Sequence, residues 1–106
     1  KTEQNMTWQM PKQGGIAYHL KGTLRYKMGD WYKLMNDFFD HHCKSNIQET
    51  IAIHLFNTII KTCNKSSIEQ VEYFFENKLI RTLNTSLKNI GIVITDISLE
   101  DSFQNE

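Results

Sequence analysis

The sequence predicts an α+β fold in which antiparallel strands, an N-terminal hairpin and a C-terminal strand, pack against about three helices. Three observations lead to this prediction. Apolar and polar residues alternate along residues 16–28, as in a strand with one buried face. Residues 68–90 carry an apolar stripe at helical spacing. Gly91 then favours a helix end, and the β-branched residues 92–99 favour a strand directly after it.

The composition is that of one globular domain, with 106 residues of which 40% are hydrophobic and 23% charged. Its 12 basic and 12 acidic residues give no net charge, which argues against a dedicated nucleic-acid-binding protein. We therefore expect a single domain over residues 1–106. Within it we expect a strand hairpin in residues 6–28, helices in residues 31–90 and a final strand in residues 92–99.

The hairpin is predicted from two alternating segments separated by a turn. Met6, Trp8 and Met10 alternate with polar residues after a frayed terminus in residues 1–5, and residues 11–15 hold the proline and glycines of a turn. On the second strand one face is expected to be packed, and Gly22 on that face is expected to mark a bulge or a bend. That packed face consists of Ile16, Tyr18, Leu20, Gly22, Leu24, Tyr26 and Met28. The opposite, wet face consists of Ala17, His19, Lys21, Thr23, Arg25 and Lys27.

Three helices are predicted between the hairpin and the final strand. The first covers residues 31–40 with Asp30 as its cap, and the second covers residues 47–63. The third is expected to be one continuous helix over residues 68–90, opened by a capping box of Ser66 and Glu69. Its stripe consists of Ile68, Val71, Phe75, Leu79, Thr82, Leu83, Leu87 and Ile90. Further apolar residues beside the stripe fit either self-association or a wider core stripe, and they are Tyr73, Phe74 and Ile80.

Metal-ligand residue types occur in the chain, but their spacing is poor for a metal site. The candidates are His41, His42, Cys43, His54 and Cys63. Adjacent residues rarely reach one tetrahedral ion, and no Cys-x-x-Cys or His-x-x-x-His pair is present. A polar loop between helices explains residues 41–43 more simply, so we expect no metal and no cofactor.

Thiol and carboxylate catalysis are also weakly supported. Cys63 lies at a predicted helix C-terminus, where the helix dipole opposes a thiolate, and its pairing with Cys43 depends on the fold. Asp96, Glu100 and Asp101 fit a solvated acidic tail better than a catalytic pair. No phosphate loop, nucleophile elbow or dinucleotide fingerprint is present, so we expect no catalytic residue.

Residues from about Ile16 to Phe103 resemble the stomatin/prohibitin/flotillin superfamily, the SPFH or band 7 domain. The strand end at residues 24–32, LRYKMGDWY, is similar to the family's Y-R-V-x-D-P pattern, with Trp31 where the family usually has proline. The helix IAIHLFNTIIKTC, residues 51–63, follows the family's next helix without its common arginine. The most specific segment is LKNIGIVITDISL, residues 87–99, which fits the family's L-x-x-x-G-I-x-V-x-D-V-x-I strand.

The resemblance implies a non-catalytic scaffold that self-associates and organises partner membrane proteins or proteases. Because the sequence begins at Lys1 rather than Met, we expect it to be a trimmed piece or a mature product of a longer protein. The resemblance implies that this longer protein is anchored to a membrane through a segment outside the sequence. This segment alone is expected to be soluble and not to bind nucleic acid. The expected interaction residues are Lys21, Arg25 and Lys27 on the long strand and Ile92, Ile94, Asp96 and Leu99 on the last one. A small soluble α+β module that binds a protein or ligand is the alternative, and a metal or thiol enzyme comes third.

Overall fold

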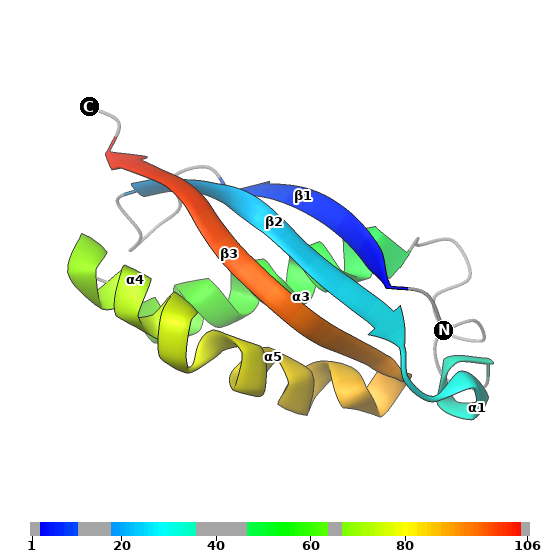
Figure 1. The fold of residues 1–106 in the computed structure, drawn as a ribbon. Coiled ribbons are helices and arrows are strands. Elements are labelled where there is room, and N and C mark those ends of the chain that lie inside the picture. Colours follow the sequence, from blue (N-terminus) through cyan, green and yellow to red (C-terminus); the bar gives the residue numbers. More distant parts are fainter. Residues whose placement is uncertain (1–2, 11–17, 36–46, 64–66, 105–106) are drawn as a thin grey trace.

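The computed structural model describes residues 3–10, 18–35, 47–63 and 67–104. Its strands are β1 (Gln4–Met10), β2 (Tyr18–Met28) and β3 (Ile92–Gln104). Its helices are α1 (Trp31–Lys33), α3 (Ile47–Cys63), α4 (Ile68–Asn77) and α5 (Leu79–Leu87), followed by the 3₁₀ turn η2 (Lys88–Ile90). The strands form one antiparallel sheet in the order β1-β2-β3, and helices cover one of its faces (Figure 1). The predicted α+β class is therefore confirmed.

The core lies between this sheet face and the helices. Leu20, Leu24 and Tyr26 of β2 are buried there, whereas Lys21 and Arg25 point to the opposite, open face. This confirms the predicted packed and wet faces at these positions of the long strand. The helices supply the other half of the core through their buried residues, which are Ile51, Leu55, Ile59, Cys63, Val71, Phe74, Phe75, Leu79, Leu83 and Leu87.

Several boundaries differ from the sequence prediction. Gln4 and Asn5 were expected in a frayed terminus but pair with β2, and β3 continues beyond residue 99 to Gln104. Asp30 caps α1 as predicted, since its side chain accepts a hydrogen bond from the Lys33 backbone N–H at 3.2 Å. The predicted hairpin turn at residues 11–15 and much of the predicted helix over residues 31–40 lie outside the described residues.

The long third helix is interrupted at Lys78, which separates α4 from α5. The backbone of Lys78 leaves helical geometry with φ −132°, so the prediction of one continuous helix is wrong. The capping box is also one residue further on, because Ser67 and Gln70 exchange the two bonds that were assigned to Ser66 and Glu69. Phe74 belongs to the core, while Thr82 of the predicted stripe is exposed.

Gly91 ends the helical segment as predicted and connects it to β3. Its φ is 88°, in the left-handed region, and its carbonyl accepts hydrogen bonds from the backbone N–H groups of Gly29 and Asp30. A Cβ at Gly91 would lie 2.5 Å from the Asp30 carbonyl oxygen. A side chain is therefore excluded where the end of β2 meets the start of β3.

Two bulges shape β3. At the first bulge, Arg25 pairs with Asp96 and the next residue, Tyr26, pairs with Ile94, so Thr95 is an extra residue of β3. At the second bulge, next to Gly22, Glu100 is the extra residue of β3. The first bulge changes the phase of the side chains, so that Ile94 and Ile97 face the helices although they are three positions apart. Of the bulge or bend predicted at Gly22, the structure shows a bulge, and its extra residue lies on β3 rather than on β2.

An aromatic stack joins β1 to α4 beneath the central strand. The rings of Trp8 and Phe75 are stacked, with centroids 5.6 Å apart. Trp8 lies opposite Gly22 in the sheet, and a Cβ at Gly22 would come within 3.0 Å of the indole. The absence of a side chain at Gly22 therefore lets the indole cross under β2 to reach Phe75.

Candidate interaction surfaces

The open face of the sheet carries charges of opposite sign on adjacent strands. Arg25 of β2 donates from Nη2 to Asp96 Oδ2 of β3 at 3.2 Å, and its Nε lies 3.8 Å from Glu3 Oε1. The side chains of Arg25 and Asp96 are 50% and 56% exposed, so this ion pair contributes at most about 1 kcal/mol to folding. Its charges remain accessible to a partner.

A hydroxyl and carboxylate network continues along the same face. Thr23 Oγ1 donates to Glu100 Oε2 at 3.1 Å, and Thr23 Oγ1 and Ser98 Oγ are 3.0 Å apart. Because the single Thr23 proton goes to the carboxylate, Ser98 is the donor in the second bond. Glu100 is thereby held over the sheet beside β2, close to exposed Lys21.

The seven predicted interaction residues do not form one surface. Lys21, Arg25 and Asp96 are exposed on the open face, where Lys27 is half-buried. Ile92 and Ile94 are fully buried between the sheet and the helices, and partly buried Leu99 packs against the same core. The structure thus places the charged members of the set on the open face and the apolar members on the covered one.

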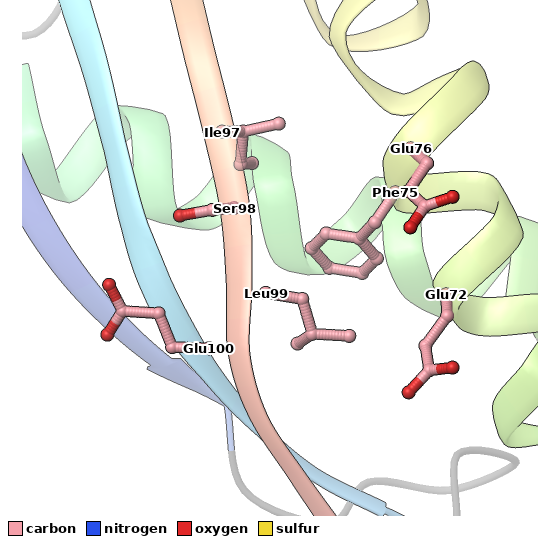
Figure 2. Close-up of a pocket in the computed structure, with 7 residues that line it drawn as sticks. All are labelled: Glu72, Phe75, Glu76, Ile97, Ser98, Leu99 and Glu100. Atoms are coloured by element: carbon pink, nitrogen blue, oxygen red, sulfur yellow. The ribbon is translucent and has the colours of Figure 1, made fainter.

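A second surface, which sequence reasoning missed, is a groove between β3 and α4. Phe75, Ile97 and Leu99 form its apolar floor, and Glu72 and Glu76 lie on its α4 rim. In Figure 2, Phe75 and Leu99 point toward one another across the groove, while Ser98 and Glu100 point over the other side of the strand. The cavity has a volume of about 600 Å³. A second cavity of about 450 Å³ shares Phe75, Glu76 and Ile97 and continues toward Lys78 and Arg81.

Among the residues that the structure describes, β3 pairs only with β2, so its other edge, beside this groove, is free of a paired strand. Asn84 of α5 closes this edge at Ile94: its Oδ1 accepts from the Ile94 N–H at 2.7 Å, and its Nδ2 donates to the Ile94 carbonyl at 3.0 Å. The Ile94 backbone therefore points away from β2. In an antiparallel ladder, residue pairs that are hydrogen-bonded to each other alternate with pairs whose N–H and C=O groups point away from the partner strand. Ile97 and Leu99 stand two and four pairs beyond Ile94, so their backbone groups point away from β2 as well.

The signals for this groove in the sequence were present but ambiguous. Residues 92–99 hold apolar side chains at Ile92 and Ile94 and then at Ile97 and Leu99, a change of phase that indicates a bulge. Strict alternation instead puts Asp96 on the face of Ile94. The role of Asn84 carried no signal, since a polar residue on a helix next to the stripe is ordinary.

A serine and a histidine meet on the helical layer, where Ser86 Oγ lies 3.3 Å from His54 Nδ1. A serine–histidine pair can act in nucleophilic catalysis only if a third group orients the imidazole and hydrogen-bond donors are placed to stabilise an oxyanion. Ser86 of α5 is exposed and His54 of α3 is half-buried, and neither is among the residues that line the two cavities described above. The bond's evident effect is to join the two helices.

Cys63 is buried at the end of α3, and burial raises the pKa of its thiol above the ordinary value of 9.0. The folded protein thus keeps this proton at pH values where the unfolded chain loses it, so stability falls as the pH rises above about 9. We expect the free-energy difference between the wild type and Cys63→Ala to shrink as the pH rises above about 9 in urea unfolding experiments. A difference independent of pH contradicts this prediction.

No group of three His, Cys, Asp or Glu residues able to hold a metal ion is present in residues 3–10, 18–35, 47–63 and 67–104. The candidates His41, His42 and Cys43 lie outside those ranges. Over the same residues, no helix has the length and apolar character needed to span a bilayer.

Comparison with protein-family models finds no family that matches this chain. A search of curated proteins likewise finds no match.

Proposed function

We propose that this chain is a non-catalytic interaction domain of a membrane-associated scaffold, which self-associates and organises partner membrane proteins or proteases. The similarity of residues 87–99 to the SPFH pattern supports this function. The observation that carries it is the open sheet face, where the cations Lys21 and Arg25 on β2 lie beside the carboxylates Asp96 and Glu100 on β3.

This charge pattern is complementary to itself. Consider two copies whose open faces meet and are related by a two-fold axis that runs parallel to the strands, between β2 and β3. In this arrangement β2 of each copy lies over β3 of the other. Sheets stack about 10 Å apart, which brings Lys21 and Arg25 near the carboxylates of the second copy. Charges of opposite sign then meet across the interface, so association weakens as salt rises.

Reversing the two cations tests the proposed function in the complete protein, extracted in mild detergent. For the double variant Lys21→Glu and Arg25→Glu, we expect the wild-type oligomer to shift to smaller species, because carboxylates then face carboxylates. Light scattering coupled to gel filtration measures the mass, at low salt and again at high salt.

The matched control reverses Lys61 and Lys88, exposed lysines on the helical layer, and is expected to keep the wild-type mass. A complete protein that is monomeric and does not sediment with membranes would overturn the scaffold function. The alternative of a soluble binding module then remains, and the groove beside β3 is the observation in its favour.

A further inference from the structure

We infer that the groove beside β3 binds an extended peptide that adds to the sheet as a fourth strand and carries an apolar side chain flanked by Lys or Arg. This inference concerns a surface other than the open face and does not depend on self-association. Three features of the described residues support it: the free edge, the apolar floor and the charge of the rim.

The free edge supplies backbone hydrogen bonds. Ile97 and Leu99 direct their N–H and C=O groups away from β2, and the structure gives these groups no partner among the residues it describes. An added strand satisfies such groups regardless of its sequence, which is the source of affinity in strand addition. Asn84 already occupies the edge at Ile94, so pairing starts beyond that point and covers only a short stretch.

The apolar floor supplies a place for one side chain. Alternate residues of an added strand point toward the helices, where Phe75 and Leu99 face one another beneath a cavity of about 600 Å³. Phe75 is held in place by its stack with Trp8. A side chain the size of valine or leucine fits this space and is removed from water there.

The rim supplies the charge preference. Glu72 and Glu76 are exposed on α4 along the groove, and neither has an ion-pair partner among the residues described. Basic residues that flank the apolar one and point to the same side of the added strand therefore lie near Glu72 and Glu76, whereas acidic residues there are repelled.

The test uses the 106-residue chain and a capped peptide of sequence TKTVRK, which places valine between basic residues. We expect NMR amide shifts concentrated at Ile97 and Leu99, with slower hydrogen exchange of both amides at saturation. A peptide of sequence TETVEE should bind at least about fivefold more weakly, because its charges match those of the rim.

The variant Glu72→Gln with Glu76→Gln should lose roughly fivefold in affinity for the basic peptide, whereas Glu69→Gln, elsewhere on α4, should lose none. Both are exposed substitutions that leave the core intact. The inference is overturned if shifts fall on Lys21 and Arg25 instead, or if the acidic peptide binds equally well. It is also overturned if Ile97 and Leu99 become protected with rising protein concentration alone, because a second copy then occupies the edge.

Discussion

Replacing Gly22 with valine is expected to lower the free energy of unfolding by about 4 kcal/mol or more, which is a large part of the stability of an ordinary domain. A Cβ at this position would meet the Ser98 carbonyl oxygen and lie 3.0 Å from the Trp8 indole. Both neighbours are fixed, one by the bulge and the other by its stack on Phe75. Urea unfolding followed by tryptophan fluorescence measures the loss.

Intrinsic strand propensity predicts the opposite sign for this change, since valine favours a strand over glycine by up to about 1 kcal/mol. The matched control is Thr7→Val, on the exposed side of β1 opposite Thr23, which is expected to change stability by less than about 0.5 kcal/mol. A Gly22→Val protein as stable as the control contradicts the close packing of Gly22 against β3.

Replacing Asn84 with alanine is expected to cost about 2 kcal/mol, because the Ile94 N–H and C=O both lose their partner in a partly buried setting. Asn84→Asp is more informative. An ionised carboxylate still accepts from the Ile94 N–H but repels the Ile94 carbonyl, so stability should recover as the pH falls below about 4 and the carboxyl becomes a donor. Thermal unfolding over a pH series checks both variants.

Asn89, an exposed asparagine in η2, provides the control, and Asn89→Ala is expected to leave stability within about 0.5 kcal/mol of the wild type. If Asn84→Ala matches this control, the Asn84 side chain does not close the edge of β3.

Periodicity was sufficient to predict the sheet and its covered face. Met6, Trp8 and Met10 and the alternation along β2 placed the right side chains in the core, because period two allows only two faces. The end of the helical segment at Gly91 was equally predictable, since a positive φ there selects glycine.

The features that shape the candidate surfaces were harder to predict because they depend on tertiary contacts. The break at Lys78 leaves the apolar spacing of residues 68–90 unchanged, so the stripe reads as continuous. The bulge at Thr95 changes which residues of β3 share a face and separates Asp96 from Ile94. The groove arises only when Phe75 and Leu99, 24 positions apart, are brought together by the fold.

The two bulges of β3 also bear on how this chain resists aggregation. An exposed edge strand invites open-ended stacking of further chains into fibrils, which requires long, flat, regular pairing. Thr95 and Glu100, five positions apart, each add local twist, so a straight strand can follow the edge only over the few residues between them. The two bulges thus permit one short added strand but oppose open-ended growth of the sheet.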